Sequence, residues 1–174
     1  MKHWLSIILL LLPVAPLVAK DPKFRGYVLD TAAFGKIQSY CFDTYNLPPR
    51  EVKVIHEFLA RESRPNGLLA KLPWHRAATC QEGHPDAIVR PEFPSGRFPS
   101  LFMNRDINGV LFVFRAGSPS PIYETREVLM TYTFDISNDG FATEALEHDA
   151  LYFVVQILIR DWQKLAETLR AASY

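Results

Sequence analysis

The sequence lacks a charge excess and lacks the short motifs that identify many enzymes. Lys and Arg number 19, as do Asp and Glu, so the formal net charge is zero and no nucleic-acid partner is indicated. No glycine-rich phosphate loop follows a predicted strand, and there is no G-x-S-x-G nucleophile motif. Internal repeats and low-complexity tracts are absent as well. With 48% hydrophobic residues, the chain has the composition of an ordinary globular domain.

The first residues have the composition of a signal peptide. Lys2 precedes an apolar run at 4–12, and Ala19 provides a small residue at the cleavage position. The alternative is an uncleaved membrane anchor, but the uncharged run is near the lower length limit for a span and contains two prolines. No cysteine follows the run, so lipid attachment is not indicated. We predict a signal peptide at 1–19, one domain at 20–174, a periplasmic or secreted location and no stable transmembrane span after cleavage.

Cys41 and Cys80 are the only cysteines, and an oxidising compartment favours joining them. Such a disulfide would close a loop of about 40 residues. Independent thiols are one alternative. A metal site that includes His75, His84 and Asp86 is another, but the spacing matches no zinc signature and a disulfide would consume the thiolate. We therefore predict the disulfide, no metal site and no cofactor.

Residues 141–169 have the helical periodicity of a long amphipathic helix. Its broad apolar side indicates that it lies across a sheet. The expected polar stripe comprises Asp149, Gln156, Arg160, Gln163 and Glu167. The expected apolar side comprises Leu151, Val154, Leu158, Trp162 and Leu165, widened by Phe153, Val155, Ile157 and Ile159.

Alternation of apolar residues and turn residues predicts the remaining elements. The order strand, helix, antiparallel strands and long helix predicts an α+β fold. We expect a two-layer sandwich, with a mainly antiparallel sheet and two helices packed on one face. Strands are expected at 23–30, 36–44, 68–74, 86–93, 109–115 and 122–134, with a bulge or exposed edge at 125–127, and a helix is expected at about 48–62.

A long connection at 94–108 is the best candidate for a binding surface. Connections of this length are uncommon in compact domains unless they are functional or disordered. This one carries aromatic residues that are costly to expose without a role. The alternative is that the aromatic side chains close the end of the core. The candidate binding residues are Trp74, Phe93, Arg97, Phe98 and Phe102.

The sequence leaves the question of enzymatic activity open. Our first hypothesis is an exported, non-enzymatic envelope or periplasmic domain that binds a partner protein or an envelope component. The alternative is a small hydrolase-type enzyme that uses His75, His84 and Asp86 near the Cys80 loop. A structural accessory role is a third possibility. His56 is interpreted as a half-buried packing residue, because no partner acid can be assigned to it.

Several short motifs along the chain occur in a recognisable order. Asp30 precedes the strand FGKIQSY at 34–40, and Gly67-Leu68 follows the first helix. An Asp-x-hydrophobic strand at 86–89 and a hairpin that begins at 109 come before the C-terminal helix. This order resembles bacterial envelope domains catalogued as domain of unknown function 4136. The resemblance implies an envelope location and an α+β fold, and it implies no activity and no catalytic residues.

Overall fold

The computed structural model describes residues 26–94, 104–125, 127–133 and 140–171. The predicted signal peptide and Arg97, Phe98 and Phe102 lie outside these residues. The described elements are β1 Gly26–Val28, α1 Thr31–Phe34, β2 Ser39–Phe42, α2 Pro49–Glu62, the 3₁₀ helix η1 Leu69–Lys71, β3 His75–Arg76, β4 Ala87–Glu92, β5 Asn104–Arg115, β6 Pro121–Thr125, β7 Val128–Thr133 and α3 Gly140–Ala171.

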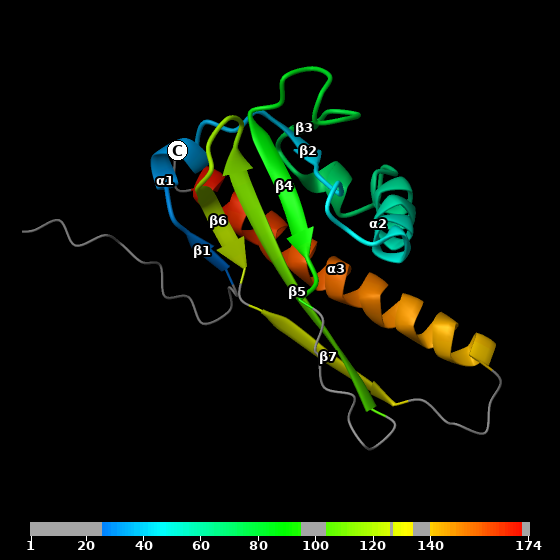
Figure 1. The fold of residues 1–174 in the computed structure, drawn as a ribbon. Helices are drawn as coiled ribbons and strands as arrows, with labels where there is room; N and C mark the ends of the chain where they lie inside the picture. Colours follow the sequence, from blue (N-terminus) through cyan, green and yellow to red (C-terminus); the bar gives the residue numbers. More distant parts are fainter. Residues whose placement is uncertain (1–25, 95–103, 126, 134–139, 172–174) are drawn as a thin grey trace, which may run out of the picture.

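The strands form one mixed sheet in the order β1-β6-β5-β4-β2-β3, and β7 pairs with the first half of β5 (Figure 1). β2 runs parallel to β3 and β4, whereas the other described pairs are antiparallel. The long strand β5 is therefore the centre of the sheet, because it pairs with β4, β6 and β7. The predicted α+β class and the mainly antiparallel sheet are confirmed.

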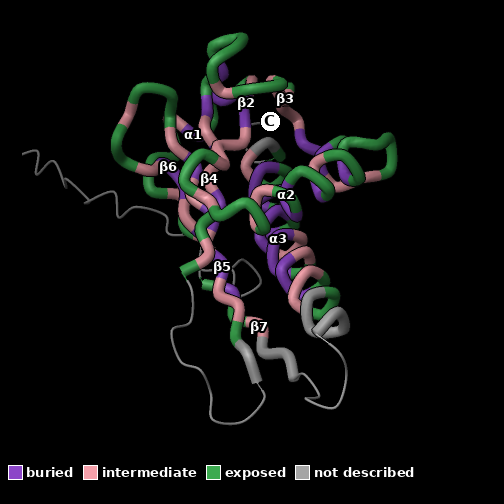
Figure 2. Tube along the Cα trace, turned by 45° about the vertical axis from the view of Figure 1, so that its right-hand side comes forward, coloured by how far each residue is buried: buried purple, intermediate pink, exposed green. Residues whose placement is uncertain are grey.

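Helices α3 and α2 lie together on one side of the strands (Figure 2). The side chains of Val89, Val113 and Trp162 have no exposed surface and belong to the same core as Ile55 and Phe58 of α2. At Gly109, a Cβ atom would collide with Val154 of α3. The glycine thus allows the middle of α3 to pack directly against the backbone of β5.

The predicted C-terminal helix is confirmed, with two corrections to its faces. Phe153 was expected on the apolar side but is 46% exposed. Gln163 was expected in the polar stripe but is only 7% exposed, and its side-chain amide donates a hydrogen bond of 2.8 Å to Glu167 Oε1. The predicted apolar side is too wide, because it includes Phe153. Gln163 can be buried at low cost, because its side-chain amide has a hydrogen-bond partner.

The predicted strand at 68–74 is wrong. The N–H groups of Lys71 and Leu72 donate to the carbonyls of Leu68 and Leu69, which gives the local bonding of η1. Residues three apart in a 3₁₀ helix share one side, and Leu69 and Leu72 are accordingly both buried. In this part of the chain, the first strand is β3, which comes after η1.

The predicted connection at 94–108 is wrong at its end, because β5 already begins at Asn104. The predicted return strand is divided into β6 and β7 at the expected interruption. There the side chain of Thr125 replaces a missing backbone partner: its Oγ1 accepts a hydrogen bond of 2.8 Å from the Leu111 N–H. A buried donor is thus satisfied at the break.

Candidate interaction surface

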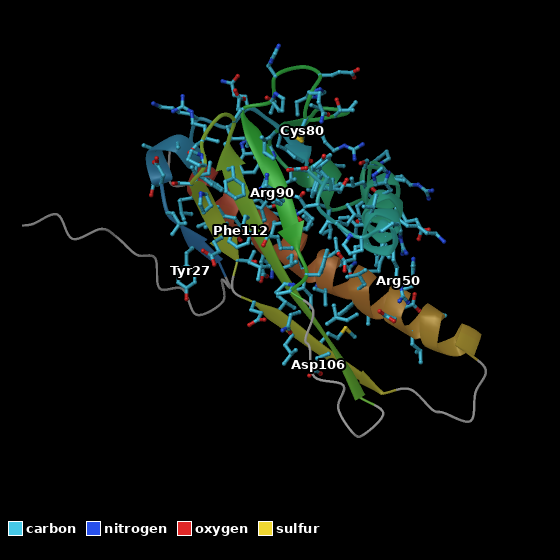
Figure 3. The ribbon with its side chains drawn as sticks, in the orientation of Figure 1. Tyr27, Arg50, Cys80, Arg90, Asp106 and Phe112 are labelled. Atoms are coloured by element: carbon cyan, nitrogen blue, oxygen red, sulfur yellow. A yellow bond between two sulfur atoms is a disulfide. The ribbon has the colours of Figure 1, made fainter. Side chains whose placement is uncertain are left out.

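The face of the sheet opposite the helices carries half-exposed aromatic and charged side chains. We define the open face as Tyr27, Ile88, Arg90, Val110, Phe112, Phe114 and Glu124. Each alternates along its strand with a residue that packs toward the helices, as the pleat requires. Figure 3 shows Tyr27, Phe112 and Arg90 on the strands that face the viewer, with the C-terminal part of α3 behind those strands.

Strand register brings four of these residues into one row. Arg90 is paired with Phe112, Phe112 with Glu124, and Glu124 with Tyr27, so the row crosses β4, β5, β6 and β1. The Arg90 guanidinium lies 4.9 Å from the centroid of the Phe114 ring, within the range of a cation–π interaction. The open face therefore combines aromatic surface with both signs of charge.

A hollow of about 460 Å³ adjoins the open face where the parallel strands β2 and β4 end beside the start of α2. Arg90 joins the two regions, since its Nη2 donates to Asp43 Oδ2 at 2.8 Å and both residues line the hollow. The walls also include Glu51, Glu92 and Phe93, along with several prolines. The carboxylates outnumber the single guanidinium, so the hollow favours cationic groups.

Burial raises the pKa of the Glu51 carboxyl at the first turn of α2. The nearby charge of Arg50 opposes this shift, whereas the carboxylate of Glu147 adds to it. Arg50 itself pairs with Glu147 at 2.8 Å. A basic group that entered the hollow would oppose this rise in the pKa of Glu51, because an opposite charge favours ionisation.

The predicted disulfide between Cys41 and Cys80 is present, with 5.2 Å between the two Cα atoms. Tyr40, the neighbour of Cys41, points into the core, where its ring contacts Trp162 at a centroid distance of 5.2 Å. Alternation therefore turns Cys41 toward the opposite side, beside Ile88 of the open face. The disulfide fastens the Cys80 loop over one end of that face, and Cys41 is fully buried as a result.

The structure places the two described candidate binding residues in different surroundings. Phe93 lines the hollow and packs partly against the core. Trp74 instead packs between Phe34 and Trp162, with ring centroids 5.4 Å and 5.3 Å away. No described contact joins Phe93 to Trp74, and a shared binding surface for the two remains a prediction.

The three residues of the hydrolase alternative do not form a hydrogen-bonded set within the described part of the chain. Asp86 Oδ2 accepts bonds of 3.0, 2.9 and 3.0 Å from the Gln38 N–H and from the N–H and hydroxyl of Ser39. The bond from Gln38, with those from Ser39, lowers the pKa of Asp86. This carboxylate holds the start of β2, and among the described residues its hydrogen bonds go to Gln38 and Ser39 rather than to His75 or His84.

His56 is also placed differently from the sequence interpretation. Its side chain is exposed on α2 and lines a smaller hollow near β3, whereas a half-buried packing position was expected. Among the residues that the structure describes, no group of three His, Cys, Asp or Glu side chains is arranged to hold a metal ion. None of the described helices combines the length and apolar character of a membrane span.

Sequence reasoning missed Phe112 and Phe114, because every second residue of β5 around them is also apolar. A continuous apolar run predicts a strand that is buried on both sides. Polar residues in the neighbouring strands are the signal that one face of β5 is open. Arg90 and Glu124 interrupt apolar sequences at positions that alternate with buried residues, and each pairs across to Phe112.

No protein-family model matches the chain, and no curated protein matches it. The resemblance to domain of unknown function 4136 is therefore not confirmed. Solved structures with a similar arrangement include a PelC dodecamer from Paraburkholderia phytofirmans, at 9% identity and a TM-score of 0.42, covering 79% of this chain and 92% of that one.

Two further similar structures are described as lipoproteins. A candidate lipoprotein from Caulobacter crescentus CB15 has 14% identity and a TM-score of 0.44, covering 83% of this chain and 96% of that one. A minor lipoprotein from Acinetobacter baumannii has 6% identity and a TM-score of 0.46, covering 74% and 94%. These identities and TM-scores are too low to transfer a function from the similar structures to this chain.

Proposed function

We propose that this chain is an exported, non-enzymatic domain of the bacterial envelope that binds another protein through its open face. The observation that carries the proposal is the row Arg90, Phe112, Glu124 and Tyr27, which crosses four strands on the side without helices. Aromatic residues and Arg are enriched in protein–protein interfaces, whereas Lys and Glu are depleted. Phe112 lies near the middle of this row and is the expected energetic centre.

Charge supports a partner whose contact surface is basic. The carboxylates of Asp43, Glu51 and Glu92 line the hollow together with the single guanidinium of Arg90. Glu124 adds a further carboxylate two strands away in the row. Complementary charge accelerates association and selects among partners more than it increases affinity. Basic residues of the partner would face the hollow, and its apolar residues would cover Phe112 and Phe114.

Export is supported by two independent features. The residues at 1–19 have the composition of a signal peptide. Cys41 and Cys80 are joined, and disulfides persist in oxidising compartments such as the bacterial periplasm. These features together support a periplasmic or secreted location.

The test compares two Phe→Ser variants of the full chain in capture from envelope extract. Phe112→Ser alters the open face, and Phe153→Ser alters an exposed Phe on α3. We expect one protein to be captured by wild type and Phe153→Ser, and to bind Phe112→Ser about 30-fold more weakly when purified, as for an interface hot spot of about 2 kcal/mol. Equal binding to both variants, at equal melting temperature, would contradict the proposal.

A further inference from the structure

The sheet ends at β3, and the outer edge of this strand is left without a described neighbour. The N–H groups of His75 and Ala77 each donate a bond of 2.8 Å to β2, to the carbonyls of Gln38 and Tyr40. Successive N–H groups in a strand point to opposite sides. The N–H of Arg76 therefore points outward, away from β2, where an added strand could bond to it.

β2 continues beyond the end of its pairing with β3. The last described pair is Tyr40 with Arg76. The N–H of Asp43 donates a bond of 2.9 Å to the Val89 carbonyl on β4. By the same alternation, the N–H of Phe42 points to the other side, into the space where β3 has ended.

A hollow of about 260 Å³ occupies this space between β2, the residues after β3, and α2. Phe42, Leu59 and Ala77 give it apolar walls. Its lining includes Arg76 and His56 and contains no carboxylate among the described residues. The hollow is smaller than the roughly 300–1,000 Å³ of small-molecule sites, so it suits one side chain of a longer ligand.

The Arg76 side chain is available to such a ligand. It is half-buried and forms no ion pair or hydrogen bond within the described parts of the chain. A guanidinium beside apolar walls binds a carboxylate strongly, because the ionic bond is shielded from water there.

We propose that the β3 edge and this hollow bind an extended peptide segment of another protein, in which an apolar residue and an acidic residue stand two positions apart and therefore face the same side. The peptide backbone would pair with the Arg76 N–H and add a strand to the sheet, a common mode of peptide recognition. The apolar side chain would enter the hollow against Phe42 and Leu59. The carboxylate two residues away, on the same side of the added strand, would pair with the Arg76 guanidinium. This site is separate from the open face and does not depend on it.

A displayed library of random linear peptides, selected on the purified full chain, tests this proposal. We expect the enriched peptides to share an acidic residue two positions away from a Val, Ile or Leu. Synthetic copies should bind the Arg76→Gln variant about tenfold more weakly, as expected for a lost charged hydrogen bond. The matched control is Arg64→Gln, which removes an exposed guanidinium after α2 and should bind as wild type does.

A second variant keeps the test informative if Arg76→Gln disturbs folding. Ala60 lies exposed on α2 in the wall of the hollow, so Ala60→Trp should fill the space without touching the core and should abolish binding. A peptide copy with a methylated backbone amide at its centre should bind at least tenfold more weakly. Failure to enrich any peptide, enrichment of basic peptides, or equal binding to Ala60→Trp and wild type would overturn the proposal.

Discussion

The two faces of the sheet are made by the same strands but differ in what they contact. On β5, Leu111 and Val113 are buried under the helices, while Phe112 between them is half-exposed. On β4, Val89 is buried and its neighbour Arg90 reaches Asp43. The comparison shows that hydrophobicity alone does not identify the covered face. The polar residues of the neighbouring strands distinguish the two faces.

Truncation of a large side chain should give the largest difference in stability loss between the two faces. Trp162 is fully buried and contacts both Tyr40 and Trp74. Trp162→Ala should lower the free energy of unfolding by about 3–5 kcal/mol, because a cavity remains. Phe112→Ala should cost about 1 kcal/mol or less, since solvent already reaches the ring. Urea denaturation measures both, and equal losses would contradict the division into covered and open faces.

Removal of the disulfide tests how the loop is held on the open face. The paired variant Cys41→Ser with Cys80→Ser should lose about 4 kcal/mol in the chain-entropy model for a closed loop of this length. The measurement is urea denaturation of wild type and variant under oxidising conditions. Wild type treated with a reductant serves as the control and should approach the stability of the variant. If the urea midpoint were unchanged in both the double variant and the reduced wild type, the disulfide would not constrain the fold.

Addition of a single methyl group to each face of β5 compares how tightly the covered face and the open face are packed. Gly109→Ala places a Cβ against Val154 and close to Leu158, so it should destabilise the fold by about 1–3 kcal/mol. Val110→Ile adds one methyl group on the open face and should change stability by less than about 0.5 kcal/mol. Thermal unfolding of both variants measures the difference. A more stable Gly109→Ala variant would mean that α3 does not pack directly on β5.

The smallest expected effect is a pH dependence at the contact between the covering helices. His148 Nε2 of α3 lies 2.7 Å from Glu57 Oε2 of α2, and Nδ1 lies 3.3 Å from Asp149 Oδ1. The hydrogen bond to Glu57, aided by the charge of Asp149, raises the pKa of His148. Arg50 and Glu147 form a neighbouring ion pair.

A raised pKa in the folded state means that protonation stabilises the fold. This contribution is complete below the unfolded pKa of about 6.5 and is lost as pH rises through the folded pKa. The groups are partly exposed, so we expect about 1 kcal/mol or less. Melting temperatures of wild type and His148→Gln should differ more at pH 5.5 than at pH 8.5. A difference that grew with pH would contradict this sign.

Sequence patterns predicted the elements that repeat over many residues. α3 was found close to its observed bounds because eight turns of apolar periodicity average out single exceptions such as Phe153. The disulfide followed from two cysteines and a signal-like segment. The short helix α1 was missed, since four residues contain only one turn. Its one signal was Asp30, whose Oδ1 caps the helix by accepting a bond of 2.9 Å from the Ala33 N–H.

The candidate surfaces could not be predicted from sequence for two physical reasons. Strand register brings Tyr27, Glu124, Phe112 and Arg90 into one row, and register depends on pairings between residues far apart in the chain. The hollow near β3 depends on where its pairing with β2 stops, which local propensity does not determine. Phe93 could be named as a candidate because an aromatic residue beside a proline-rich stretch is a local feature of the sequence, and it does line the larger hollow.

The most direct test of the open face is photocrosslinking in cells that make the full chain. A photoreactive phenylalanine analogue would replace Phe112 in one strain and Phe153 in another. Both positions are partly exposed, but only Phe112 lies on the proposed interface. If the open face is the interface, we expect one discrete crosslinked protein from position 112 and none from position 153. No crosslink from position 112, or the same products from both positions, would contradict it.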